Sequence, residues 1–272
     1  MRLVTLSVLI LSLCLMSACN GRQAASVVIA GSTSVQPYAE ILAEEYAILY
    51  PDKAIDVLGG GSSAGITAVE SEIADIGMSS RSLKESEWHL WKVEIAKDGL
   101  AIIVNPDNSI SDLTREQIRG IYTGEITNWS ELGGADARIH VIAREEGSGT
   151  RSAFEEMVMD DRRITPKAIV MNTNGAVRQL VVGDPYSIGF LSLGLIDIGE
   201  RPVKALQLNG VAATRENVVA GVYPLYRSFL FVATEEPSGP SAQFIEFIFS
   251  PRGRQVLEDE GLVTEVSEER YP

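Results

Sequence analysis

The 272-residue sequence contains only two cysteines and two histidines, and this scarcity restricts its chemistry. Cys14 and Cys19 both lie close to the N-terminus, so no disulfide framework can hold the rest of the chain. His89 and His140 are far apart in the sequence, and no set of histidines and cysteines has the spacing of a metal site. We therefore expect neither a metal nor another cofactor.

Basic residues are also in the minority: 23 lysines and arginines stand against 37 aspartates and glutamates, a formal net charge of −14. An acidic surface disfavours nucleic acid as a partner. It does not exclude a small anion, because donors within a few ångströms of a buried ligand outweigh surface carboxylates that salt screens over about 8–10 Å. The hydrophobic share of 45% and the charged share of 22% are typical of globular proteins, and the length allows two domains.

The N-terminus has the pattern of an export signal. Arg2 precedes an apolar run over residues 3–16, which is too short to favour a transmembrane helix. The small residues before Cys19 resemble the lipobox of bacterial lipoproteins, in which this cysteine is acylated and becomes the new N-terminus. Met16 stands where leucine is usual, so an ordinary signal peptide cut at a nearby alanine stays open as an alternative. Either interpretation predicts an exported protein, and the first predicts a lipid anchor at the cell envelope, on its periplasmic or extracellular face.

A strand-to-helix turn at residues 144–151 concentrates groups that bind anions. Alternating residues predict a strand before it, and helical spacing predicts a helix after it. The first turn of a helix leaves backbone N–H groups unpaired, and a glycine such as Gly149 lets an oxyanion approach them. Arg144 can offer a planar fork to two oxygens of such an anion, and the hydroxyls of Ser148 and Thr150 are further donors. Taken alone, the stretch also fits an ordinary capped turn with solvated arginines.

Three further turns precede this one. Each follows a short apolar strand and carries hydroxyl groups: Gly31-Ser32-Thr33-Ser34, Gly59-Gly60-Gly61-Ser62-Ser63 and Asp75-Ile76-Gly77-Met78-Ser79-Ser80-Arg81. Strands that alternate with helices predict parallel α/β layers, in which the loops at the carboxyl ends of the strands gather at the switch point of the sheet. We therefore expect the four turns to converge.

The spacing of the predicted elements divides the chain into two lobes. A polar segment at 105–111 suits a crossover into a second lobe, and the apolar run 226–232 suits a return to the first. An apolar helix around Phe244 and Ile248 is expected to pack on the first lobe. The predicted units are a lipoprotein signal peptide at 1–19, a tether at 20–26, lobe 1 from 27–104 plus 227–272, and lobe 2 from 105–226.

An enzymatic alternative rests on Gly61-x-Ser63-x-Gly65, which matches the nucleophile elbow of α/β-hydrolases. Such a serine needs a histidine base and an acidic partner. His89 lies in an aromatic cluster and His140 in an alternating strand, where packed or surface histidines are expected. An exported serine hydrolase that uses Ser63 is the alternative to a binding protein.

Taken together, the ordered motifs resemble the phosphate-binding lipoproteins that serve the bacterial high-affinity phosphate ABC transporter. The markers lie between about residues 27 and 262 and include 31–37, 60–66, 75–81, 126–129, 144–150 and 250–253. The resemblance implies a two-lobed periplasmic-binding-protein fold of the type with two crossovers, which closes on one phosphate. It further implies a monomer without enzymatic activity that delivers phosphate to the membrane permease subunits of the transporter.

The resemblance also implies a set of phosphate ligands in the four loops. They are Ser32, Thr33, Ser34, Ser62, Ser80, Arg81, Arg144, Ser148, Gly149 and Thr150. In well-known members an aspartate after the third strand accepts the proton of hydrogen phosphate, and Ser80 stands at the matching position. A hydroxyl can accept that hydrogen bond but can also donate to sulfate, so Ser80 alone predicts weaker discrimination of phosphate from sulfate. Another tetrahedral oxyanion, such as sulfate or molybdate, is the alternative cargo.

Overall fold

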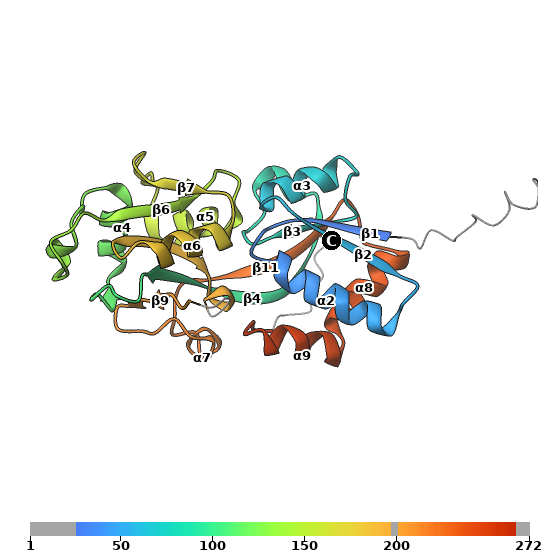
Figure 1. The fold of residues 1–272 in the computed structure, drawn as a ribbon. Coiled ribbons are helices and arrows are strands. Elements are labelled where there is room, and N and C mark those ends of the chain that lie inside the picture. Colours follow the sequence, from blue (N-terminus) through green and yellow to red (C-terminus); the bar gives the residue numbers. More distant parts are fainter. Residues whose placement is uncertain (1–25, 197–200, 265–272) are drawn as a thin grey trace, which may run out of the picture.

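The computed structural model describes residues 26–196 and 201–264, which form two α/β lobes joined by two strands (Figure 1). Lobe 1 is the unit built on strands β1 (Ser26–Gly31), β2 (Ala54–Gly59) and β3 (Ile76–Ser79). Lobe 2 is the unit built on β6 (His140–Arg144), β7 (Ile169–Met171) and β8 (Ser187–Ser192). The two-lobed α/β fold was predicted from the sequence. The signal peptide, Cys19 and all but the last residue of the tether lie outside the described residues. In the described ranges, no helix is long and apolar enough to cross a membrane.

The sheet of lobe 1 has the strand order β2-β1-β3-β11-β4. Its first three strands run parallel, and β11 is antiparallel to both of its neighbours. The strands are β1 (Ser26–Gly31), β2 (Ala54–Gly59), β3 (Ile76–Ser79), β11 (Tyr226–Ala233) and the first part of β4 (Trp91–Val104). Every residue of β3 is buried, as expected of a central strand with a covered sheet face on either side.

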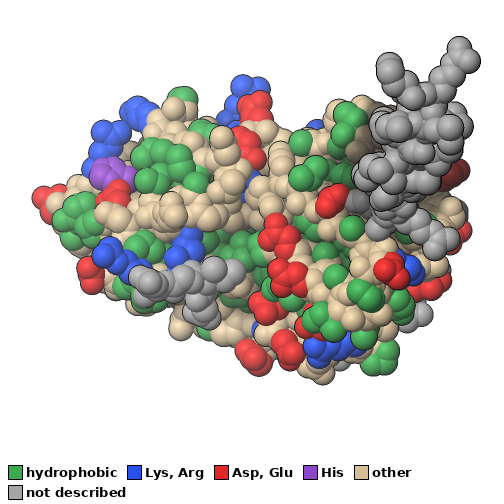
Figure 2. Space-filling view, turned by 45° about the vertical axis from the view of Figure 1, so that its right-hand side comes forward, with side chains coloured by type: hydrophobic (Ala, Val, Ile, Leu, Met, Phe, Trp, Pro, Cys, Tyr) green, Lys and Arg blue, Asp and Glu red, His purple; other side chains and the backbone are tan. Residues whose placement is uncertain are grey.

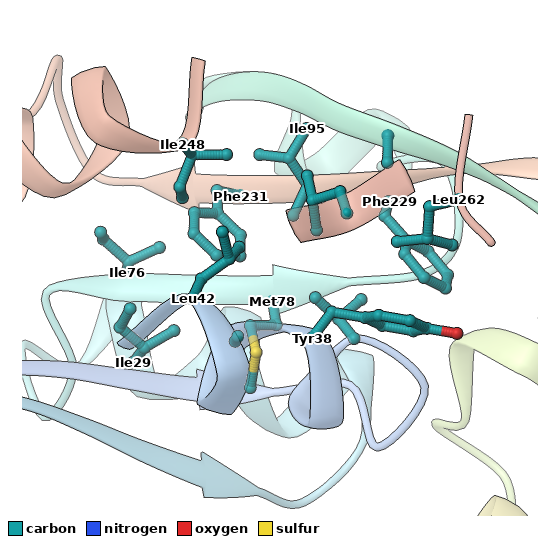
Figure 3. Close-up of a cluster of buried hydrophobic side chains, with 14 of the residues drawn as sticks. Ile29, Tyr38, Leu42, Ile76, Met78, Ile95, Phe229, Phe231, Ile248 and Leu262 are labelled. Carbon is teal, nitrogen blue, oxygen red and sulfur yellow. The ribbon is translucent and has the colours of Figure 1, made fainter. Parts of the chain in front are cut away.

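Helices cover both faces of this sheet (Figure 1). Three lie on one face, namely α2 (Gln36–Leu49), α8 (Gly239–Phe249) and α9 (Pro251–Asp259), and α3 (Ser62–Glu70) lies on the other. In the first layer, Leu42 of α2 packs towards Phe231 of β11, and the ring of Tyr38 lies on the side of Phe229, with the two ring centroids 5.8 Å apart (Figure 3). Met78 of β3 belongs to the same buried cluster. Ile248 of α8 belongs to the same buried cluster, which confirms the predicted packing of the apolar C-terminal helix on lobe 1.

The sheet of lobe 2 continues from the second part of β4 through β8, β6 and β7, with β9 on the other side of β4. Strands β6, β7 and β8 run parallel to each other. The strands are β6 (His140–Arg144), β7 (Ile169–Met171), β8 (Ser187–Ser192) and β9 (Lys204–Ala205), and a separate small sheet pairs β5 (Asp112–Leu113) with β10 (Gln207–Leu208). The helices are α4 (Arg115–Thr123), α5 (Gly149–Phe154), α6 (Asn174–Gly183) and α7 (Arg215–Val219).

Short helical segments complete the two lobes. A π-helical turn, η4 (Glu155–Met159), continues α5, and three 3₁₀ turns are η2 (Glu85–Glu87), η3 (Trp129–Leu132) and η5 (Leu193–Leu195). The core of lobe 2 includes a stacked pair of rings, Phe154 and Phe190, whose centroids lie 4.2 Å apart. This contact fixes α5 against the sheet. The loop that follows Arg144 leads directly into α5, so it is held in place as well.

The two lobes are joined by the paired strands β4 and β11 (Figure 1). Strand β4 pairs with β11 up to Gly99 and with β8 from Leu100 onward, so it belongs to both sheets. From the sequence, an apolar strand was expected only over residues 100–104, the second part of β4, with the end of lobe 1 at residue 104. The strand is longer because Trp91, Val93 and Ile95 point into the core of lobe 1 while the residues between them are less buried.

Candidate functional site

Four loops meet between the lobes, as the sequence predicted. Three follow β1, β2 and β3 in lobe 1, and the fourth follows β6 in lobe 2. Their polar side chains are almost fully buried, each with an exposed fraction of 2% or less: Ser32, Ser34, Ser62, Ser80, Arg144, Ser148 and Thr150. Thr33 is partly buried. Buried polar groups in such number need partners, and the hydrogen bonds among them define the site.

Within lobe 1, three serines from three loops are connected. The hydroxyl of Ser32 donates to Ser80 Oγ at 2.8 Å, and the backbone N–H of Ser80 donates to Ser62 Oγ at 3.1 Å. Gly61 caps α3 with φ +92°, a conformation that glycine adopts readily, and this turn places Ser62 at the first helical position. The strand-to-helix turns thus bring their hydroxyls and first-turn N–H groups to one point.

Other contacts cross from lobe 1 to lobe 2. Ser34 Oγ lies 2.7 Å from Thr150 Oγ1, and Arg144 Nη2 donates to Thr33 Oγ1 at 3.2 Å. Gly149 is packed so tightly against lobe 1 that a β-carbon on it would lie 2.2 Å from Ser62 Oγ and 2.5 Å from Ser80 Oγ. The lobes are therefore closed on each other at the site.

The Arg144 guanidinium is fixed on one side and free on the other. Nε and Nη2 each donate to a carboxylate oxygen of Glu145 at 2.9 Å, and Nη2 also donates to the carbonyl of Asn172 at 3.0 Å. Nη1 is buried and has no hydrogen-bond partner in the described part of the chain. Ser148 Oγ accepts from the backbone N–H of Arg151, so its own proton is free to be donated. Arg144 Nη1 and the hydroxyl of Ser148 are therefore free hydrogen-bond donors, which suit a ligand with several acceptor oxygens.

Arg81, which the sequence predicted as a ligand, is engaged by Glu87. Its Nη1 and Nη2 donate to the two carboxylate oxygens of Glu87 at 2.7 and 2.9 Å, and Nη2 also donates to Ser63 Oγ at 3.3 Å. Only Nε lacks a partner among the residues described. Burial would raise the pKa of Glu87, but hydrogen bonds from Arg81 and from the backbone of Lys84, with the charge of Arg81, lower it overall.

The two histidines have other partners than Ser63. His140 Nδ1 lies 2.6 Å from a carboxylate oxygen of Asp184, and His89 Nε2 lies 3.6 Å from one of Glu70. Both imidazoles are largely exposed. Within the described ranges, no hydrogen bond joins Ser63 to a histidine, so the geometry of a catalytic triad is not formed there.

Two buried residues in the site were missed by sequence reasoning. Asn174, the first residue of α6, donates from Nδ2 to Ser34 Oγ at 2.9 Å, and Arg227 of β11 donates from Nη2 to the same oxygen at 3.1 Å. Asn174 follows β7 in another strand-to-helix turn, and this signal could have found it. Arg227 is a charged residue within an apolar run, and a charged side chain in a buried strand needs a partner of opposite charge.

Asp98 of β4 is the partner of Arg227. The two residues are register partners on neighbouring strands, and Asp98 is 1% exposed. Burial raises the pKa of Asp98, against the opposing charge of Arg227 and a hydrogen bond from Ser192. Burial lowers the pKa of Arg227, with a smaller contribution from the like charge of Arg144. The second guanidinium thus lies within electrostatic reach of the first.

The chemistry of the site suits an anion rather than a metal. Its free groups are mainly N–H and O–H donors, and the described residues contain no group of three His, Cys, Asp or Glu side chains that could hold a metal ion. Acidic side chains are spread over the face of the molecule shown in Figure 2. The positive groups of the site are buried instead, where the dielectric screening by water is weak.

Comparisons with known proteins agree with this architecture. Residues 18–252 match the model of the PBP superfamily domain. A structure of a putative phosphate ABC transporter substrate-binding protein with bound phosphate from Clostridium perfringens is 42% identical, with a TM-score of 0.84, and the match covers 89% of this chain and 100% of that one. An ABC-type phosphate transport receptor from Vibrio cholerae is 37% identical, with a TM-score of 0.73, over 88% of this chain and 100% of that one.

Among curated sequences, the phosphate-binding protein PstS of Bacillus subtilis is 30% identical over 243 residues, which cover 88% of this chain and 80% of the relative. PstS of Borreliella burgdorferi is 29% identical over 97% of this chain and 99% of its own length. The chain therefore belongs to the PBP superfamily and, within it, to the family of phosphate-binding PstS proteins.

Proposed function

We propose that this protein binds inorganic phosphate between its lobes and delivers it to the membrane permease of a phosphate ABC transporter. The observation that carries the proposal is the buried Arg144, whose Nη1 has no partner among the described residues, while its Nη2 donates across the lobes to the hydroxyl of Thr33. A guanidinium donor left free in such a place favours a ligand with several acceptor oxygens. Relatives described as phosphate receptors support phosphate as that ligand.

The proposed ligands act as donors to the phosphate oxygens. Arg144 supplies charge and a directed N–H, and Gly149 supplies a backbone N–H in the first turn of α5. Hydroxyls and loop N–H groups complete the shell, from Ser32, Thr33, Ser62, Ser80, Ser148 and Thr150. Ser34 is proposed to join them by turning its proton from Thr150 Oγ1 to a phosphate oxygen when the ligand is bound. Arg81 is proposed to add positive charge beside the loop of Ser80, with Nε as its free donor. Closure of the lobes would remove water and strengthen each of these bonds.

The cellular setting is also a proposal. Residues 1–19 are proposed to be a lipoprotein signal peptide, and Cys19 the anchor of a monomeric protein at the cell envelope. The relatives are named as binding proteins and receptors, which supports a function without catalysis. Acyl mass on the processed N-terminus, measured by mass spectrometry, tests the anchor. An unmodified N-terminus would contradict it.

Parallel calorimetric titrations with phosphate, sulfate and molybdate test the proposed ligand. We expect one phosphate per chain, with a dissociation constant of about 1 µM or below, and weaker binding of the other two anions. Tighter binding of sulfate or molybdate would change the cargo, and the absence of binding would refute the proposal. Incubation with a fluorophosphonate probe tests the hydrolase alternative, since stoichiometric labelling of Ser63 would indicate an enzyme.

A further inference from the structure

Asn174 lies at the meeting point of the two lobes. It is 1% exposed, and its Nδ2 donates to Ser34 Oγ at 2.9 Å and to Thr33 Oγ1 at 3.4 Å. Both hydroxyls belong to the loop after β1, so this amide of lobe 2 reaches across to lobe 1. Its other polar atom, Oδ1, is buried without a hydrogen-bond partner in the part of the chain described.

The surrounding hydrogen bonds account for the orientation of this amide. Ser34 Oγ accepts from Asn174 Nδ2 and from Arg227 Nη2, which occupies both of its lone pairs. Its single proton then points to Thr150 Oγ1 at 2.7 Å. In this network Nδ2 faces the hydroxyls, and Oδ1 remains as an acceptor for a group that is not part of the chain.

Besides Asn174 Oδ1, the polar atoms near Ser34 that lack a hydrogen-bond partner among the described residues include two donors. Nη1 of Arg144 and Nη1 of Arg227 are both buried without partners among the described residues. The carboxylates nearby are already used, because both oxygens of Glu145 accept from Arg144 and those of Asp98 accept from Arg227 and Ser192. The free groups therefore include two charged donors and one neutral acceptor.

A tetrahedral anion that carries one proton satisfies both kinds of group. Three oxygens of hydrogen phosphate accept hydrogen bonds, and the protonated oxygen can donate to a carbonyl. Sulfate has no proton near neutral pH, so it would place an oxygen lone pair against the carbonyl oxygen and leave this acceptor unsatisfied. A buried acceptor without a partner costs binding free energy, which is how polar sites reject analogues that lack a donor.

We propose that Asn174 Oδ1 accepts a hydrogen bond from the protonated oxygen of bound hydrogen phosphate and that Asn174 thereby selects against fully ionised oxyanions such as sulfate. The inference rests on the proposed binding of phosphate at this site. A neutral carbonyl accepts this hydrogen bond without repelling a doubly charged ligand, unlike a carboxylate. Asn174 would thus supply the acceptor function that a hydroxyl at Ser80 provides only weakly.

The test is the ratio of sulfate to phosphate dissociation constants, measured by calorimetry at pH 7 for wild type, Asn174→Leu and Asn174→Asp. The leucine variant removes the carbonyl at similar volume, and we expect phosphate affinity to fall by about 10- to 100-fold while sulfate affinity does not fall. The aspartate variant keeps an acceptor, and we expect it to keep or increase the rejection of sulfate. Gln179→Leu is the matched control, because Gln179 is an exposed amide side chain on the same helix, α6, and it should leave both constants unchanged.

Equal losses for both anions in Asn174→Leu would show a merely structural role and overturn the inference, as would an unchanged ratio. Asn174→Ala, which also removes the carbonyl, replaces the leucine variant if thermal melting shows that leucine prevents folding. A wild-type protein that binds no phosphate would refute the proposed function itself, whereas wild-type binding with an unchanged ratio in the variants would refute only the role of Asn174.

Discussion

Arg227 donates from both Nε and Nη2 to one oxygen of Asp98, at 3.1 and 3.0 Å, across the two strands that join the lobes. The other oxygen of Asp98 accepts from Ser192 of lobe 2, and Arg227 also donates to Ser34 of lobe 1. This ion pair therefore connects the crossover to both lobes and to the site. Loss of this ion pair should therefore destabilise the closed arrangement of the two lobes at the site.

Replacement of Arg227 by methionine is expected to leave the Asp98 carboxylate buried and unpaired. Loss of one partner of a buried pair costs about 3–5 kcal/mol, so the urea midpoint at pH 7 should fall strongly. The double variant Asp98→Leu/Arg227→Met should recover much of this loss. Arg252→Met is the control, because it breaks an exposed pair with Glu45 and should cost less than about 1 kcal/mol. Similar small effects for Arg227→Met and Arg252→Met would contradict the prediction.

Gly149→Ala should block closure without disturbing the fold of either lobe. The new β-carbon would lie 2.2 Å from Ser62 Oγ and 2.5 Å from Ser80 Oγ, while alanine is a good helix former at this position in α5. We expect phosphate affinity to fall by about 100-fold or more at nearly unchanged melting temperature. Gly183→Ala, where nothing lies within 4 Å, serves as the control in the same titration. Near-native affinity of Gly149→Ala would mean that phosphate does not require this closed contact.

Arg144→Ala should weaken phosphate binding by about 100-fold or more, because no other proposed ligand combines its charge with its directed N–H groups. Calorimetry measures the change, and circular dichroism melting checks the fold. Arg138→Ala removes an exposed arginine upstream of the same strand and should have little effect. If both variants bind phosphate equally well, Arg144 is not a ligand.

Phosphate affinity of the wild type should hold or rise from pH 6 to pH 8. Phosphate changes in this range from a singly to a doubly charged form, with an ionisation near pH 6–7, and a site rich in donors favours the higher charge. Ser80→Asp adds a fixed negative charge and should reverse this trend, since it favours the form with more protons, while it rejects sulfate more strongly. Competition binding between pH 6 and pH 8 measures both effects. A wild-type affinity that falls as the pH rises would require a carboxylate in the binding shell.

The Arg81 and Glu87 pair predicts a pH dependence of folding. The pKa of Glu87 is lowered in the folded protein, because hydrogen bonds and the charge of Arg81 outweigh burial. The pair therefore contributes to stability at neutral pH, and the contribution is lost as the pH falls from about 4.5 through the lower folded-state pKa. Glu87→Gln should lower the urea midpoint more at pH 7 than at pH 3, and the exposed neighbour substitution Glu85→Gln should have little effect at either pH. An equal effect of Glu87→Gln at both pH values would contradict the assignment.

Much of the fold and part of the site follow from local sequence patterns. The strand-to-helix turns at Ser32, Ser62 and Ser148 were predicted correctly and do meet, because loops at the carboxyl ends of parallel strands gather at one edge. Their role as phosphate ligands remains a proposal. The length of β4 was not predicted, since the aromatic residues at its start hid the alternation of Trp91 and Val93.

The missing parts of the site depend on contacts between distant segments. Asp98 and Arg227 become partners only through the antiparallel register of β4 with β11, and no pattern near either residue specifies that register. Arg81 was expected as a ligand because the resemblance to phosphate-binding lipoproteins implied it. Its pairing with Glu87 arises from the 3₁₀ turn that follows, which turns this carboxylate back to the guanidinium.

The position of β11 has a consequence for the order in which the lobes fold. This strand lies between β3 and β4 in the sheet of lobe 1, yet it is the last strand in the sequence of the described chain. In a chain that emerges N-terminus first, the strands of lobe 2 are all present before residue 226, whereas β3 and the first part of β4 still lack the neighbour between them. Contacts such as Met78 with Phe231 then close a long loop, and the entropy of this closure makes completion of lobe 1 the slower step. The unpaired edges of β3 and β4 are the parts of the newly made protein most exposed to wrong strand pairing and aggregation.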